Sequence, residues 1–163
     1  MDSYCDAYRG GAFHSLPIRM AMTPTDPHAL SGTAPAPPAL NIALWAVQGL
    51  LLVAFGAAGL MKLTTPADAL AASPQGLPVG LVRFIGGAEF AGALGVVLPA
   101  LTRIRPALTP LAAAGLVAVM VLAAAFHLSR GEVVEAGPAV VLGALAAFVV
   151  WGRGRRAPVA PRA

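Results

Sequence analysis

The sequence predicts an all-α membrane protein, an up-down-up-down four-helix bundle with a disordered N-terminal tail, and three observations support this. Hydrophobic residues make up 58% of the chain and charged residues only 11%, against roughly 25% charged residues in a soluble domain. Four apolar runs each approach the roughly 20 residues that cross a bilayer. Most connections between these runs are short, which makes neighbouring helices antiparallel.

Residues 1–38 are expected to form the disordered tail. They contain six prolines together with Ser, Thr and Gly, and they show no sustained apolar periodicity. A cleaved secretory signal is not expected, because no basic segment precedes an uninterrupted apolar stretch there. Met20 and Met22 are alternative starts to Met1. Cys5 is the single cysteine, which excludes an intrachain disulfide or dithiol pair and leaves a bystander role.

The four apolar runs define a transmembrane domain over residues 39–152. They cover residues 40–61, 79–98, 107–128 and about 133–151. Helices are required, because an open strand in lipid would leave backbone polar groups unpaired. Pro99 and residues 102–106 are expected to end the second run. In the long first connection, Thr65 and Pro66 resemble the N-cap and first position of a short helical turn.

Lys and Arg near the helix ends predict the orientation. Residues 153–163 form a basic tail, and Arg103 and Arg105 lie in the second connection on the same side. On the opposite side, basic residues are diluted by acidic ones. Because Lys and Arg bias insertion, we expect a multi-pass protein of the inner (plasma) membrane with both termini in the cytoplasm. Trp45 and Trp151 then fall near the cytoplasmic interface, in contact with the lipid bilayer.

Glu89 is the leading candidate for a functional residue, because it lies near the middle of the second apolar run. A central ionisable side chain costs at least about 2.5 kcal/mol, and such residues usually face a bundle interior or a wet cavity. Arg83 lies on a different face of the same helix. A partner for Glu89 must therefore come from Lys62, His127, Gln48 or water.

Gln48 and Lys62 fall on one stripe of the first helix, about 40° apart, which predicts that this stripe faces the bundle. The predicted polar pocket therefore contains Lys62, Arg83, Glu89, His127 and Gln48, and it opens toward the outer side. A structural alternative stays open for each residue. Lys62 and Arg83 can be snorkelling anchors, His127 can be a helix cap, and Glu89 can be purely hydrogen-bonded.

Several classes of site are not expected. No His, Cys or carboxylate cluster has metal-ligand spacing, since His14 and His28 lie in the tail. Nucleotide-binding glycine loops are missing, and the glycines inside the apolar runs are typical of helix packing. Basic patches interleaved with aromatic residues are also missing, so no nucleic-acid partner is predicted.

Three motifs resemble the DoxX-like family of small four-helix membrane proteins over about residues 40–153. They are Gly-x-x-Lys-Leu at 59–63, Arg-Phe-Ile-Gly-x-x-Glu at 83–89 and Phe-His-Leu-x-Arg-Gly-Glu at 126–132. The resemblance carries Lys62, Arg83, Glu89 and His127 over as motif positions. It implies association with membrane redox complexes, or a role as a membrane assembly factor, and most family members have no assigned activity.

Three hypotheses follow. The first is an accessory or quinone-associated subunit of a membrane redox complex, with no covalent cofactor. Such a chain needs a redox partner, because it has no haem pair or iron-sulfur motif. The second is a non-catalytic assembly factor or scaffold that binds another membrane protein. The third is a small proton-coupled transporter, for which a homodimer would be needed. Whether the protein is an enzyme stays open.

Overall fold

A computed structural model describes residues 37–162 of the chain. The predicted disordered tail, apart from its last two residues, lies outside this part, as do Cys5, the alternative start residues and the two tail histidines. The described part forms α1 (Pro38–Thr64), α2 (Ala67–Ala71), α3 (Val79–Thr102), α4 (Leu108–Ser129), α5 (Val133–Trp151) and the π-helix η2 (Gly152–Arg156). The predicted all-α class is confirmed.

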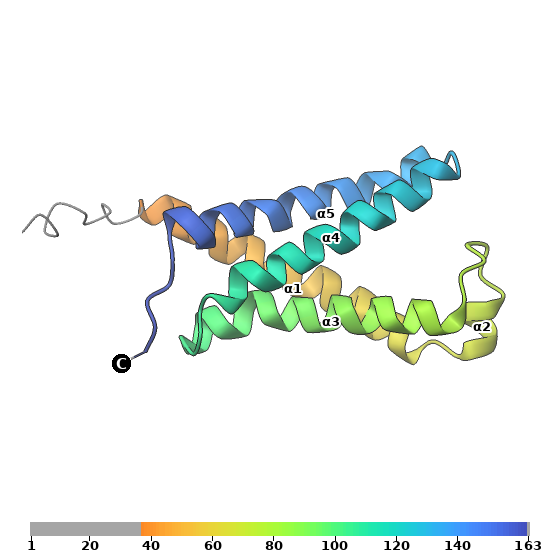
Figure 1. Ribbon diagram of the computed structural model, residues 1–163, viewed down its shortest axis with the longest axis horizontal. Helices are drawn as coiled ribbons and strands as arrows, with labels where there is room; N and C mark the ends of the chain where they lie inside the picture. The colour runs from red at the N-terminus through yellow and green to blue at the C-terminus, as the bar shows by residue number, and fades with distance from the viewer. Residues whose placement is uncertain (1–36, 163) are drawn as a thin grey trace, which may run out of the picture. The chain divides into compact units, whose positions relative to one another are not determined.

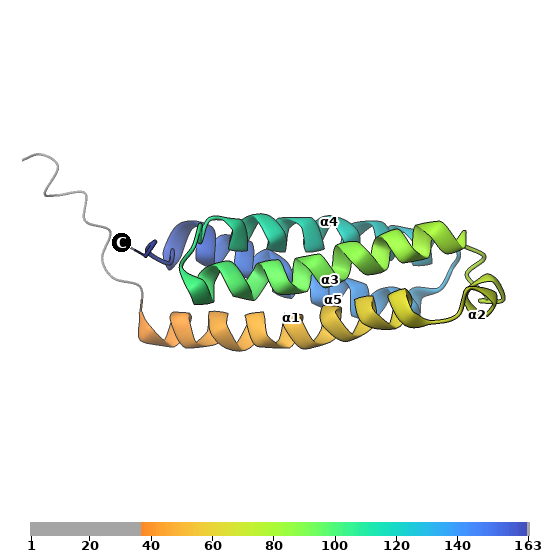
Figure 2. The same cartoon turned by 90° about the horizontal axis from the view of Figure 1, so that it is seen from below.

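Four of these helices are long and apolar enough to cross a membrane: α1, α3, α4 and α5 continued by η2. They run alternately up and down along one long axis (Figure 2). The predicted up-down-up-down bundle of four membrane helices is therefore confirmed. Exposed Leu, Val, Ile and Phe side chains cover its outer surface, as expected for helices surrounded by hydrocarbon tails.

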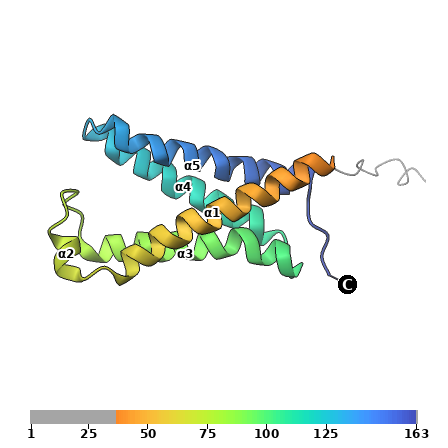
Figure 3. The same ribbon diagram turned by 180° about the vertical axis from the view of Figure 1, so that it is seen from behind.

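The helices associate as two antiparallel pairs. α1 packs along α3, and α4 packs along α5. The pairs lie together where α3 leads into α4, and they diverge toward α2 and the α4–α5 connection (Figure 1). Seen from behind, α1 crosses the bundle from α2 to the C-terminal end of α5 (Figure 3). We call these the α2 end and the Arg153 end of the bundle.

Buried apolar side chains join the two pairs in the middle of the bundle. Leu51 and Phe55 of α1, Val96 of α3, Leu116 of α4 and Val149 of α5 are all almost completely buried. Small residues bring α3 and α4 close together: a Cβ on Gly95 would lie 2.7 Å from the Cβ of Ala112. Tight packing of this kind replaces the hydrophobic effect as the main attraction between helices in lipid.

Two details of the predicted elements were wrong. Pro99 does not end the second membrane helix, which continues to Thr102 and ends there, at the start of the predicted segment 102–106. A proline removes one backbone hydrogen bond, but ending a helix within lipid would leave several groups unpaired. Thr65 does not cap α2; it ends α1 instead, and its Oγ1 donates to the carbonyl oxygen of Met61 at 2.7 Å. The short helical turn itself is present as α2.

Candidate functional site

An ion pair between α1 and α3 forms the centre of the candidate site. Lys62 Nζ lies 2.8 Å from Glu89 Oε2. The Glu89 side chain is 5% exposed and the Lys62 side chain 29%, so Glu89 is buried while Lys62 is partly exposed. The prediction that Glu89 takes its partner from another helix is confirmed, and Lys62 is that partner.

Two glycines set the distance between the helices that carry this pair. A Cβ on Gly59 would lie 2.7 Å from the carbonyl oxygen of Gly86, and a Cβ on Gly86 would lie 2.7 Å from the Cβ of Lys62. Each glycine precedes a member of the ion pair by three residues, close to one helical turn. The backbone contact at Gly59 and Gly86 therefore brings Lys62 and Glu89 into hydrogen-bonding range.

The stripe predicted on α1 does face the bundle. Gln48, Phe55 and Gly59 are buried along it, and Lys62 follows one turn later. However, the stripe is longer than the site. Gln48 lies at the level of Val96 on α3, where its Nε2 donates to the Val96 carbonyl oxygen at 2.6 Å. Among the described residues, no hydrogen bond links Gln48 to Glu89.

Arg83 joins the site through the backbone of α1. Its Nη1 donates to the carbonyl oxygens of Lys62, at 2.7 Å, and of Leu63, while Nη2 donates to that of Thr65 at 2.6 Å. The last carbonyls of a helix have no partner within the helix, and a cation is favourable at that end. Arg83 therefore caps α1 and does not pair with Glu89.

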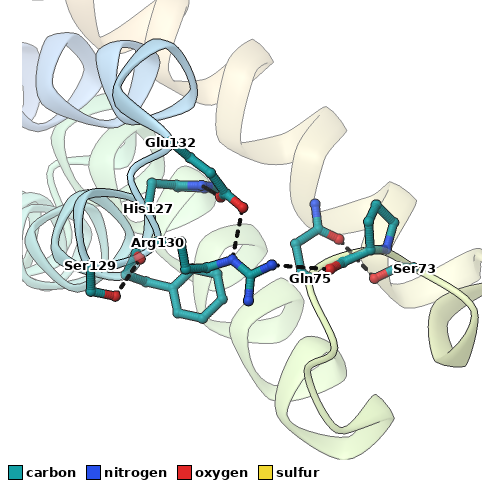
Figure 4. Close-up of polar contacts among 8 residues, drawn as sticks. Ser73, Gln75, His127, Ser129, Arg130 and Glu132 are labelled. Atoms are coloured by element: carbon teal, nitrogen blue, oxygen red, sulfur yellow. Dashed lines mark hydrogen bonds and ion pairs between the residues drawn. The ribbon is translucent and has the colours of Figure 1, made fainter.

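His127, in the last turn of α4, belongs to a second cluster with residues of the connection to α5 (Figure 4). Its Nδ1 lies 2.8 Å from Glu132 Oε2, and Arg130 Nε donates to Glu132 Oε1 at 2.7 Å. Hydrogen bonds from Arg130 and then His127 hold the pKa of Glu132 below its ordinary value of 4.5. Arg130 Nη2 also donates to the carbonyl oxygen of Pro74 at 3.2 Å, which links the two helix pairs at the α2 end.

The five predicted site residues therefore fall into three groups. Lys62, Arg83 and Glu89 come together on α1 and α3. His127 lies in the last turn of α4, and no hydrogen bond joins it to Glu89 within residues 37–162. Gln48 lies toward the Arg153 end.

Sequence reasoning missed the partner of Gln48. Arg153 was assigned to the basic tail, but it is only 4% exposed, and its Nε donates to Gln48 Oε1 at 2.8 Å. Two features of the sequence could have identified Arg153. The fourth apolar run ends only two residues before it, and Gln48 on α1 needed a polar partner.

The motif positions that carry the resemblance thus have defined structural roles in the α1–α3 pair and the α4–α5 connection. A family model described as the DoxX-like family matches residues 46–149, well over half of the chain. The chain belongs to the DoxX-like family. Comparisons of this DoxX-like protein with curated proteins and with solved structures give no match.

Membership agrees with the multi-pass membrane architecture, because the matched region begins within α1 and ends within α5. The motif ending at Leu63 and the motif from Arg83 to Glu89 supply both sides of the ion pair and the cap on α1. The third motif supplies the cluster of His127, Arg130 and Glu132. All three motifs therefore lie at the α2 end of the bundle.

Proposed function

We propose that this DoxX-like protein is an accessory, quinone-associated subunit of a membrane redox complex. The observation that supports this most is the Lys62–Glu89 pair, with its 2.8 Å separation and its buried carboxylate. Ionisable groups within membrane helices are costly and commonly mark binding sites or proton routes. We further propose that the α2 end faces outward and that both termini are cytoplasmic in the inner membrane, following the Lys and Arg balance.

The donor set around Glu89 fits a quinone head group by its chemistry. When bound, a quinone accepts electrons and protons together. The partly exposed Lys62 ammonium can donate a hydrogen bond to a carbonyl oxygen, and the Glu89 carboxyl group can hold a proton beside it. Arg83 would keep Lys62 in place by binding its backbone carbonyl.

The proton route we propose runs through Lys62. A relay through His127 lacks a direct link, since His127 is hydrogen-bonded to Glu132 and not to Glu89. The Lys62 side chain is partly exposed, and its Nζ is in contact with the Glu89 carboxylate. Electrons would have to come from a partner subunit, because a chain with one cysteine cannot ligate an iron-sulfur cluster.

A second candidate is a non-catalytic scaffold or assembly factor, favoured by a specific observation. Each charged group at the α1–α3 pair is used within the chain: Lys62 by Glu89, and Arg83 by three carbonyl oxygens at the end of α1 and its C-cap. Such a set can hold α1 against α3 without any ligand. In this case the exposed apolar faces would bind the helices of another membrane protein.

Native mass spectrometry of the protein extracted from its own membrane tests both candidates. Wild type would be compared with Glu89→Gln, and Glu135→Gln is the matched control, because Glu135 is an exposed carboxylate in the first turn of α5. The quinone proposal predicts a bound quinone that is retained in Glu135→Gln and lost in Glu89→Gln.

The other outcomes separate the candidates. A stable protein partner without quinone, unchanged in Glu89→Gln, would support the scaffold and overturn the quinone proposal. Equal quinone content in wild type and both variants would also overturn it, because the quinone would then be bound without Glu89.

A further inference from the structure

The Arg153 end of the bundle contains a pocket of about 520 Å³. It lies between the start of α1, the end of α3 and the segment that follows η2. The polar and aromatic side chains in its lining are those of Asn41, Trp45, Arg103 and Arg153, and Ala157 to Ala160 form one wall. None of the three family motifs contributes to it.

Arg153 is the unusual member of this lining, because it is a buried cation. Its Nε donates to Gln48 Oε1 and its Nη1 to Asn41 Oδ1, both at 2.8 Å. Nη1 also donates to the Ala157 carbonyl oxygen at 3.3 Å, and the guanidinium lies 4.9 Å from the centre of the Trp45 ring. All of these partners are neutral.

No negative charge compensates Arg153 within residues 37–162. The ion pairs of this part of the chain involve Glu89 and Glu132 only. Its other acidic residues, Asp68 and Glu135, lie in α2 and in the first turn of α5, both at the opposite end of the bundle. Buried charges in proteins are usually paired, so the Arg153 end has an unbalanced positive charge.

One nitrogen of this guanidinium is also unused. Arg153 Nη2 is buried and has no hydrogen-bond partner among the described residues. Leaving a buried donor unpaired costs free energy, and the large majority of buried polar groups avoid it. An unpaired donor on an uncompensated cation, in a pocket lined by a second arginine, matches an anion.

We propose that this pocket binds a phosphate group, held by Arg153 Nη2 and the guanidinium of Arg103. Guanidinium groups suit phosphate because their planar donors match its oxygens and because they stay charged. Nη2 is shielded from solvent, so binding requires part of the pocket lining to shift. The backbone N–H of Arg162, which donates to the Arg103 carbonyl oxygen at 3.1 Å, ties the wall formed by Ala157 to Ala160 to the same arginine.

Two sources share this chemistry: the head group of an anionic phospholipid and free phosphate. The pocket lies at the ends of membrane-length helices, which is the level of lipid head groups. Apolar lining residues such as Leu101 and Trp45 would suit the start of the acyl chains of a lipid. Free phosphate would use the arginines alone.

Tryptophan fluorescence provides the test, because Trp45 contacts the Arg153 guanidinium. The chain has two tryptophans, so Trp151→Phe leaves Trp45 as the single reporter. The lipid-free protein in detergent would be titrated with inorganic phosphate, with short-chain phosphatidylglycerol and, for comparison, with zwitterionic phosphatidylcholine of the same chain length. We expect a saturable change with phosphatidylglycerol or phosphate, at a concentration at least tenfold below any change with phosphatidylcholine.

Two variants and a matched control make the test specific. Arg153→Gln should raise the ligand concentration at the midpoint of the titration at least tenfold, and Arg103→Gln should raise it several-fold. Arg155→Gln removes the same charge from an exposed residue at this end that does not line the pocket, and it should leave the midpoint unchanged. If Arg153→Gln does not fold, Arg103→Gln carries the comparison, because Arg103 is exposed.

Each result of the titration leads to a different conclusion. Saturation by inorganic phosphate supports the site with a soluble anion as its ligand. Saturation by phosphatidylglycerol alone supports it with a lipid head group. The absence of a saturable change with both ligands would overturn the proposal. It would also be overturned if Arg155→Gln and Arg103→Gln raised the midpoint concentration equally.

Discussion

Arg83 Nη1 donates a hydrogen bond to the carbonyl oxygen of Lys62, 2.7 Å away. Arg83 of α3 therefore binds the backbone of Lys62. Glu89, which is also in α3, forms an ion pair with the Lys62 side chain. Arg83 and Glu89 lie six residues apart and point to different sides of α3, yet both act on one residue of α1. Lys62 therefore joins α1 to α3 through both its backbone and its side chain.

Replacing Arg83 with Gln should loosen the last turn of α1. Charge-assisted hydrogen bonds contribute roughly 1.5–3 kcal/mol each when well formed, and Arg83 supplies three of them. Hydrogen exchange of the amides at 61–65 should accelerate at least tenfold, while exchange in the middle of α4 stays unchanged. Arg105→Gln is the control, because the exposed Arg105 side chain makes no hydrogen bond within the described residues. Equal acceleration in both variants would contradict the capping role.

Removing Lys62 should destabilise the protein more than removing the pair. Lys62→Met leaves the Glu89 carboxylate buried without its partner. The expected loss of stability is about 3 kcal/mol, the lower end of the range for breaking a buried ion pair, because Lys62 is partly exposed. The double variant Lys62→Met/Glu89→Gln should regain at least half of this loss. Unfolding by denaturant in detergent micelles is measured for the wild type, for Lys62→Met, for Glu89→Gln and for the double variant. Strictly additive effects would mean that the two side chains are not coupled.

A methyl group at the contact between α1 and α3 should also be costly. In Gly59→Ala the new Cβ would meet the backbone of Gly86 and Phe90 at 2.7 and 2.8 Å, and overpacking of this kind costs roughly 1–3 kcal/mol. Gly56→Ala is the control on the same helix, because nothing lies within 4 Å of a Cβ there. Thermal unfolding should show a lower midpoint for Gly59→Ala alone. A similar loss in both variants would point to helix backbone effects instead of the contact.

The Glu132 cluster should respond to acid. Arg130 first, and His127 second, lower the pKa of Glu132 below 4.5, so the folded state favours the carboxylate. Its contribution to stability is present above pH 4.5 and is lost as the pH falls through the lowered pKa. A ¹³C titration of the Glu132 carboxyl group would measure this midpoint, and Arg130→Gln should raise it toward 4.5. An unchanged midpoint in Arg130→Gln would show that Arg130 does not stabilise the charge.

Much of the fold follows from local sequence properties. The lengths of the apolar runs predicted four membrane helices, and the first and third of these are α1 and α4 with ends shifted by at most three residues. Prediction was weaker at Pro99 and Thr65, because whether a proline ends a helix and which helix a threonine caps depend on the surroundings. Neither depends on the residue alone.

The candidate site was also predicted only in part from the sequence. Charge within an apolar run identified Glu89, and helical spacing placed Lys62 on the face toward the bundle. Spacing along one helix cannot show which residues of another helix lie at the same depth. For this reason Gln48 was grouped with Glu89 although it lies beside Val96 and Arg153.

The sequence by itself determined the all-α membrane class, the number of membrane helices and Glu89 as a carboxylate whose burial needs an explanation, because hydropathy and helical periodicity are local properties. The tertiary structure alone decided the partners. It paired Lys62 with Glu89 across the contact of Gly59 and Gly86, used Arg83 as a cap, and buried Arg153 beside Gln48. These outcomes depend on how helices cross and at what depth, and interhelical contacts set both.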